Sequence, residues 1–122
     1  MRMRTGRKVS GSDNIDAGGA AYGHDQIYDH CYFTWGTDEC FSLNNDKQPK
    51  GLYNITLQNS ILGQGCQNHS CGGLVQTSDK EGVTVFRNLF IDNKTRNFKV
   101  KGLNQFVNNV IYNWGNGAAY NM

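Results

Sequence analysis

The chain has 122 residues and a formal charge of +2, with 15 glycines against a single proline. This length allows one domain, residues 1–122, and an aromatic-containing, proline-poor composition is not typical of a disordered chain. No run of about 18 apolar residues occurs, so no membrane-spanning segment is predicted. The basic residues are scattered, which does not favour a nucleic-acid partner. The basic start, residues 1–4, lacks a following apolar stretch and does not predict a signal peptide.

An internal repeat is the most informative feature of the sequence. Each repeat joins a short apolar stretch, a polar pair and another apolar stretch, and the four copies are residues 27–33, 56–62, 85–91 and 106–112. Taking the second polar position as equivalent gives spacings of 29, 29 and 21 residues between His30, Asn59, Asn88 and Asn109. Strand-only repeats of this length predict stacked turns of a β-solenoid.

The polar position is expected to mark a corner of the coil. A sharp corner leaves backbone groups unpaired, and stacked amide side chains can satisfy them along the stack. We therefore expect the four equivalent residues to form one ladder. Each turn is expected to be completed by a further short strand, and these segments are residues 14–18, 39–43, 72–76, 98–101 and 118–122. The predicted fold is all-β, a right-handed parallel β-helix of about four rungs spaced about 4.8 Å apart.

The four cysteines have two interpretations. None of them forms a Cys-x-x-Cys pair, so zinc-ribbon and thioredoxin-type sites are not indicated. An even number permits disulfides, and Cys66 with Cys71 would close a small loop. Alternatively, all four are small buried fillers of a solenoid core.

Three long segments carry a family resemblance. Residues 28–39 resemble the "DHCSFSWGTDE" signature of polysaccharide lyase family 1, the pectate lyase superfamily, residues 88–97 resemble "HNLFAHNKSRNPRV", and residues 107–115 match "VNNVIYNWG". Residues 1–6 resemble the "RMRPG" entry into the family's central rungs. The resemblance implies the middle of a lyase domain, without the family's end caps. It also implies a secreted enzyme that cleaves an acidic plant polysaccharide by β-elimination with the help of Ca²⁺.

Carried over to this chain, the resemblance places the catalytic base at Arg96. The family's Arg-x-Pro-x-x-Arg has Phe98 at the proline and Lys101 at the second arginine. Lysine keeps the charge but loses the forked geometry of arginine. Lys99 and Lys101 are two apart on a strand and are expected to share one face, where they either bind substrate carboxylates or form a solvated basic surface.

The resemblance implies a calcium site in which some acids are replaced. Asp16 and Asp38 match two of the family's acids, whereas Asn14 and Ser42 stand where the other two are expected. Asp13 or Glu39 is a candidate to compensate, because calcium affinity depends on ligand charge. The rung that supplies a substrate-binding lysine in many family members has no lysine here. His69 is the titratable group available in its place, as a substrate hydrogen-bond donor or as a structural residue.

The expected arrangement puts Asp16, Asp38 and Arg96 on one side of the coil. The leading hypothesis is a lyase acting on an acidic polysaccharide. The altered calcium acids and Phe98 leave open a non-catalytic carbohydrate-binding or degenerate scaffold, or a fragment that is inactive alone. Uncapped ends are expected to promote end-to-end association.

Overall fold

Three parallel sheets wind around a single coil axis. The computed structural model describes residues 1–5, 14–44, 51–66, 69–77, 80 and 82–121. Sheet A consists of β1 (Arg2–Arg4), β4 (Tyr32–Thr34), β7 (Ile61–Gly63), β10 (Leu89–Ile91) and β13 (Val110–Tyr112). Sheet B consists of β2 (Gly19–Ala20), β5 (Glu39–Asn44), β8 (Cys71–Gln76) and β11 (Lys99–Lys101). Sheet C consists of β3 (Gly23–Asp29), β6 (Leu52–Gln58), β9 (Val83–Phe86) and β12 (Asn104–Val107).

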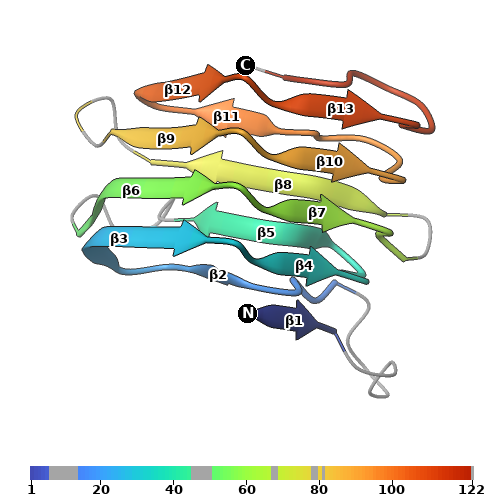
Figure 1. Ribbon diagram of the computed structural model, residues 1–122, viewed down its shortest axis with the longest axis horizontal. Coiled ribbons are helices and arrows are strands. Elements are labelled where there is room, and N and C mark those ends of the chain that lie inside the picture. The colour runs from blue at the N-terminus through green and yellow to red at the C-terminus, as the bar shows by residue number, and fades with distance from the viewer. Residues whose placement is uncertain (6–13, 45–50, 67–68, 78–79, 81, 122) are drawn as a thin grey trace.

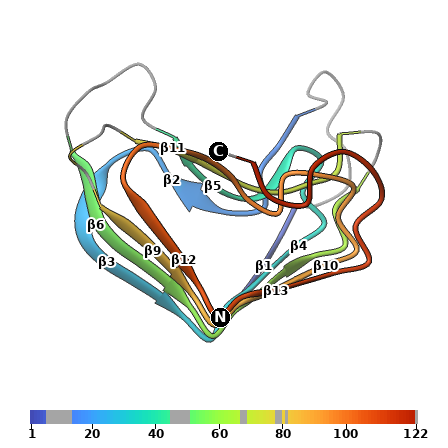
Figure 2. The ribbon, with the colours of Figure 1, turned by 90° about the horizontal axis from the view of Figure 1, so that it is seen from above.

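The stacking of these strands confirms the expected parallel β-helix. Within the described residues, four successive turns each contribute a strand to every sheet, and β13 begins a fifth (Figure 1). Seen along the coil axis, sheets A and C meet at a sharp corner and sheet B closes the opposite side (Figure 2). All neighbouring strands pair in parallel. No described residue belongs to a helix that is long and apolar enough to cross a membrane.

The core is built from rows of inward-facing side chains that repeat from turn to turn. In sheet A the pairing register aligns Met3, Phe33, Leu62, Phe90 and Ile111. The three central members of this row are fully buried. Because a one-residue slip would turn such a row to the solvent, burial of the row fixes the register of every turn.

The corner between sheets C and A has the same length in every turn. Two residues always separate the strands, and the first of them is left-handed, with φ of 51° at His30, 47° at Asn59, 54° at Arg87 and 53° at Asn108. At the next position the side chains of Ser60, Asn88 and Asn109 each accept a backbone N–H from the preceding turn, and Cys31 begins the row by donating its N–H to Ser60 Oγ. This inner ladder consists of Cys31, Ser60, Asn88 and Asn109.

The expected ladder of His30, Asn59, Asn88 and Asn109 was therefore wrong in its first two members. Ile61 pairs with Leu89, so the step between these turns is 28 residues, where the repeat had suggested 29. His30 and Asn59 occupy the outward, left-handed position. The His30 side chain is 77% exposed and its Nδ1 lies 2.9 Å from Asp29.

Two further expectations are corrected by the structure. Residues 14–18 do not form the sheet B strand, which is Gly19–Ala20, because the backbone of residues 15–17 bonds to the turn at residues 37–39 instead. All four cysteines are free thiols, so the proposed Cys66–Cys71 disulfide is absent. Cys31, Cys40 and Cys71 are buried fillers, as in the alternative interpretation, whereas Cys66 is only half-buried.

Replacing Asn88 with alanine should destabilise the coil. Asn88 is 3% exposed, accepts a hydrogen bond from the Ser60 N–H at 3.0 Å, and donates to Leu57 O at 2.9 Å and to Asn109 Oδ1 at 3.0 Å. Because several buried groups lose their partner, we expect the free energy of unfolding to fall by about 2–4 kcal/mol in urea titrations. Asn59→Gly is the matched control. Glycine keeps the left-handed corner, and the Asn59 side chain makes no buried hydrogen bond. The free energy of unfolding of this variant should therefore fall by less than about 1 kcal/mol. Equal losses in the two variants would contradict the ladder.

End-to-end association is expected to be sensitive to charge. Continuing the sheet A register from one copy to the next would place Val110 beside Arg2 and Tyr112 beside Arg4, and both β13 side chains are more than half exposed. The double variant Val110→Lys/Tyr112→Lys should therefore weaken association seen by sedimentation velocity, because like charges would meet. The Val110→Glu/Tyr112→Glu variant should strengthen it. A monomeric wild type at micromolar concentration, or no difference between the variants, would argue against this contact.

Candidate functional site

Two adjacent acidic residues, Asp38 and Glu39, stand where the turn after β4 leads into β5. Thr37 and Asp38 both donate backbone N–H groups to Ile15 O, at 2.9 and 3.2 Å. Gly36 is required in this turn because a Cβ there would lie 2.2 Å from Glu39 O. The Glu39 N–H donates to Asp16 Oδ1 at 3.1 Å, so two adjacent turns place their carboxylates together.

Three carboxylates form a compact cluster. Asp16, Asp38 and Glu39 each offer an oxygen atom within 4.8 Å of the others. Asp16 lies on the solvent side, Asp38 is partly buried and Glu39 is buried. Of the other acids or acid replacements considered from the sequence, Asn14 is exposed two residues before Asp16, Ser42 is buried, and Asp13 lies outside the described residues.

A later turn delivers Arg96 to this cluster. Its Nη1 lies 2.5 Å from Glu39 Oε1 and 3.9 Å from Asp38 Oδ1. The Arg96 backbone is left-handed, with φ of 50°, and its carbonyl accepts the Gly73 N–H at 2.7 Å. Gly72 permits this approach, because a Cβ there would lie 2.9 Å from Arg96 O and 2.5 Å from Asn97 Oδ1.

Two buried asparagines shape the loop before Arg96. Asn93 and Asn97 are each 1% exposed and bond to each other at 2.9 Å. Asn93 also donates to Leu62 O at 3.0 Å and accepts the Gly65 N–H at 3.3 Å. Phe98, at the family's proline position, is fully buried and packs edge-on against Phe90 at 5.3 Å between ring centroids. The substitution of the proline is thus accommodated by the core.

The remaining residues singled out from the sequence lie around this cluster or on β11. His69 Nδ1 is 3.5 Å from Asp38 Oδ1, and the His69 side chain is 43% exposed. Lys99 and Lys101 are both exposed on one side of β11, with buried Val100 between them. The structure places Asp16 and Asp38 in one carboxylate cluster and Arg96 beside Asp38, a closer grouping than the shared side of the coil that the sequence predicted.

The role of Glu39 as the ion-pair partner of Arg96 was missed from the sequence, where it was considered only as a compensating acid. Its position directly after the matched Asp38 is the one signal that could have indicated it. Cys71 was likewise treated only as a filler or a disulfide partner, although it lies beside the same cluster.

Burial and the ion pair act in opposite directions on these charges. Burial raises the pKa of Glu39, the hydrogen bond from Arg96 opposes this rise and neighbouring Asp38 adds to it, and together they set the pKa at about 7. Burial also raises the pKa of Asp16. Burial by itself would lower the pKa of Arg96, but its hydrogen bond to Glu39 and the nearby anionic groups leave that pKa above its ordinary value. Arg96 is therefore a cation while Glu39 holds it.

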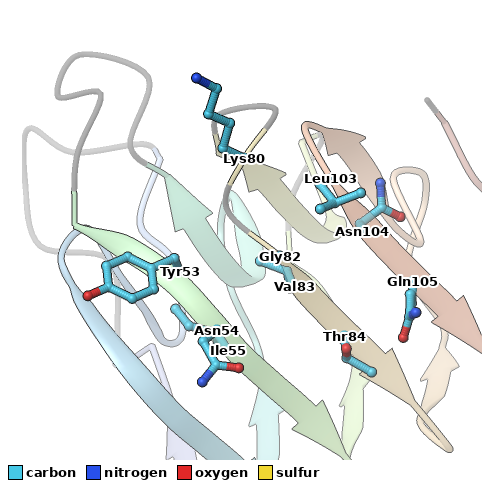
Figure 3. A pocket seen from close by; sticks show the side chains of 10 residues that line it. All are labelled: Tyr53, Asn54, Ile55, Lys80, Gly82, Val83, Thr84, Leu103, Asn104 and Gln105. Carbon is cyan, nitrogen blue, oxygen red and sulfur yellow. The ribbon is translucent and has the colours of Figure 1, made fainter.

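A separate cavity lies on sheet C, away from these residues. It is lined by residues of β6, β9 and β12 and of the connections that lead into β9 and β12, including Tyr53, Asn54, Thr84 and Gln105 (Figure 3). None of the site residues expected from the sequence lines it. The carboxylate–arginine cluster remains the candidate site because it alone combines acids, a cation and opposing effects on pKa within the described residues.

Comparison with known proteins places this geometry in context. The chain is 55% identical over 120 residues to a protein named probable pectate lyase C from Aspergillus flavus, and equally similar to one of the same name from Neosartorya fischeri. It is 52% identical over 121 residues to the one from Emericella nidulans. The chain resembles part of a pectate lyase. This confirms the resemblance seen in the motifs.

The similarity covers 98% of this chain but only 26% of each of these relatives. The pectate-lyase-like chain thus spans about a quarter of the length of the curated relatives it matches. No family model matches the sequence. No solved structure matches it either.

The raised pKa of Glu39 predicts a pH dependence of stability in the metal-free chain. Because the folded carboxyl titrates near 7 and its ordinary value is 4.5, the folded state alone keeps this proton between those values. Its stabilising contribution is thus full below pH 4.5 and is lost as the pH rises towards 7. Urea titrations with a chelator present should show a fall of about 1–3 kcal/mol from Glu39. Glu39→Gln should remove that fall and leave the part due to Asp16, whose pKa is also raised.

Asp29→Asn is the control for this measurement. Asp29 lies at an exposed corner, and hydrogen bonds from Asn59 and then His30 lower its pKa, so it titrates below the window. The free energy of unfolding of Asp29→Asn should change with pH as steeply as that of the wild type. A Glu39→Gln profile parallel to the wild type would show that Glu39 ionises normally.

Proposed function

We propose that this chain is part of a polysaccharide lyase that cleaves an acidic plant polysaccharide, of the pectate type, by β-elimination. The observation that carries the proposal is the Arg96 guanidinium held beside two members of a three-carboxylate cluster, Glu39 and Asp38, in a chain more than half identical to proteins named probable pectate lyase C. A polymer substrate of this kind lies outside the cell, so the proposed place of action is extracellular.

The reaction sets clear demands on the site. The proton on C5 of a uronate is removed, the bond between C4 and the glycosidic oxygen breaks, and a double bond forms between C4 and C5. The leaving oxygen takes a proton from solvent. The site must therefore accept a proton and stabilise negative charge that develops next to the substrate carboxylate.

Arg96 is the proposed base. A base must be neutral before it accepts a proton, and an ordinary guanidinium loses its proton only above about pH 12. In this site burial favours the neutral form, while the ion pair with Glu39 opposes it. Arg96 can act as a base only when Glu39 no longer stabilises its positive charge. The Arg96–Glu39 pair is thus the resting arrangement of the base.

The three-carboxylate cluster suits calcium. Its donors are all oxygen atoms, and Asp38 Oδ1 is buried without a hydrogen-bond partner, as expected of an oxygen prepared for a cation. Asp16, Asp38 and Glu39 would hold the ion. Bound there, calcium would neutralise the substrate carboxylate and so stabilise the carbanion-like state. Asn14, the first position expected from the family pattern, is an exposed candidate for an additional ligand.

The substrate-binding roles follow from charge and exposure. Lys99 and Lys101 present two cations on one face of β11, three and five residues after the proposed base. Their ammonium groups can pair with successive uronate carboxylates. His69 is exposed enough to donate a hydrogen bond to a sugar, and Asp38 beside it would orient the ring.

One observation favours a second function, which is binding without cleavage. An arginine whose pKa is raised by a buried glutamate recognises a carboxylate better than it removes a proton. A chain that kept this ion pair intact with substrate present would be an acidic-polysaccharide-binding scaffold. The two functions differ in whether an unsaturated product forms.

The test is the ultraviolet absorbance of the new double bond during incubation with polygalacturonate, with calcium or with a chelator. We expect a calcium-dependent rise that falls by at least about 100-fold in Arg96→Asn, the lower end for loss of a general base. Arg87→Asn is the matched control. Both arginines have left-handed backbones, with φ of 50° and 54°, and Arg87 lies over the Phe86 ring instead of the cluster. Asparagine tolerates this conformation at both positions.

The outcomes separate the two functions. A rise that persists in Arg96→Asn would exclude Arg96 as the base. Polysaccharide binding by a folded wild-type sample without any rise would favour the binding scaffold.

A further inference from the structure

Asp38 belongs to a second cluster that is chemically different from the first. One ligand atom each from Asp38, His69 and Cys71 lie within 4.8 Å of one another. These residues come from the turn after β4, the loop before β8 and the first residue of β8. The second cluster therefore combines a carboxylate oxygen, an imidazole nitrogen and a thiol sulfur.

These donors select a different class of cation. Calcium prefers oxygen donors, whereas zinc and similar first-row ions accept nitrogen, sulfur and carboxylate ligands together. Three protein ligands with one open position is the ligand count of a zinc ion that also binds water.

The backbone holds the cluster in place before any ion arrives. The Cys71 N–H donates to Asp38 O at 3.0 Å, and Cys71 also bridges in parallel to Thr95 in the following turn. Asp38 and Cys71 are therefore fixed relative to each other by sheet pairing. Only His69, on the more exposed loop, would have to adjust, and its side chain is 43% exposed.

An unsatisfied acceptor points into the cluster. Asp38 Oδ1 is buried and has no hydrogen-bond partner, since His69 Nδ1 at 3.5 Å and Arg96 Nη1 at 3.9 Å lie beyond good hydrogen-bonding distance. A buried carboxylate oxygen without a partner is costly. A cation bound between Asp38, His69 and Cys71 would remove that cost.

We propose that Asp38, His69 and Cys71 form a binding site for zinc or a zinc-like divalent cation. Because Asp38 also belongs to the carboxylate cluster, the two clusters cannot both be filled with a full set of ligands. Zinc would then antagonise calcium and, through Asp38 and the adjacent Arg96, inhibit cleavage. This antagonism rests on the proposed function, whereas zinc binding itself does not.

The positive charge of Arg96 should influence the affinity of this site for zinc. Its guanidinium lies beside Asp38 and interacts electrostatically with Cys71, so its positive charge opposes a bound cation. Removing that charge should tighten zinc binding. A structural side chain without electrostatic influence on the site would have no such effect.

The experiment uses the reduced, chelator-treated chain and two probes, Zn²⁺ by calorimetry and Co²⁺ by absorption spectroscopy. We expect one Zn²⁺ per chain, and a thiolate-to-cobalt charge-transfer band. Cys71→Ser and His69→Gln should each weaken Zn²⁺ binding at least about tenfold, and Cys71→Ser should abolish the band. Arg96→Asn should strengthen binding.

Matched controls are available for both ligands. Cys66→Ser removes the half-buried thiol outside the cluster, and His24→Gln removes an exposed histidine that stacks on Tyr53. Both should bind Zn²⁺ as the wild type does. His69→Gln alters an exposed loop residue and keeps the test valid if Cys71→Ser does not fold.

Three results would overturn the proposal: a cobalt band that survives Cys71→Ser, binding that is lost in Cys66→Ser, or equal affinity in the wild type and His69→Gln. Repeating the Zn²⁺ titration in saturating calcium tests the shared Asp38. A weaker apparent affinity supports the antagonism. An unchanged affinity would exclude the antagonism but not the zinc site. Failure of the proposed calcium site can therefore be distinguished from failure of the zinc site.

Discussion

The two-residue corner between sheets C and A is the constraint on which the rest of the molecule depends. At each corner a left-handed residue reverses the chain, and the residue after it joins a hydrogen-bond ladder between adjacent turns. Since a buried polar group without a partner is costly, each turn can stack on its neighbour in only one register. Burial of the apolar rows of the core favours the same register. Insertions are consequently confined to the other two corners, which differ in length from turn to turn.

The candidate site is a product of those variable corners. Asp38 ends the connection from sheet A to sheet B, Glu39 begins the sheet B strand that follows, and Arg96 lies in the equivalent connection two turns later. Sheet B pairing brings these connections together, because Cys71 bonds to Asp38 on one side and bridges to Thr95 on the other. The rigid coil therefore positions a side chain 57 residues away from its ion-pair partner to within hydrogen-bonding distance.

The balance between burial and charge defines what this site can do. Burial disfavours the charged forms of both Glu39 and Arg96, and their ion pair compensates each of them. Such a pair is weak as a source of stability, because desolvation offsets much of the attraction. A ligand that takes the place of one partner can nevertheless break the pair. An acidic polymer can replace Glu39, and a cation can replace Arg96. Both proposed functions therefore depend on this pair.

The sequence by itself determined the parallel β-helix, the position of the sharp corner to within one residue, and the placement of Asp16, Asp38 and Arg96 on one side of the coil. Periodic apolar strands and long motifs carry that information locally. Only the tertiary structure decided the ladder register, the absence of a disulfide, and the presence of Glu39 and Cys71 beside Arg96. These depend on which residues of different turns face each other. A spacing of 28 residues where 29 was expected shifts that relation by one position, and side-chain direction reverses with every residue of a strand.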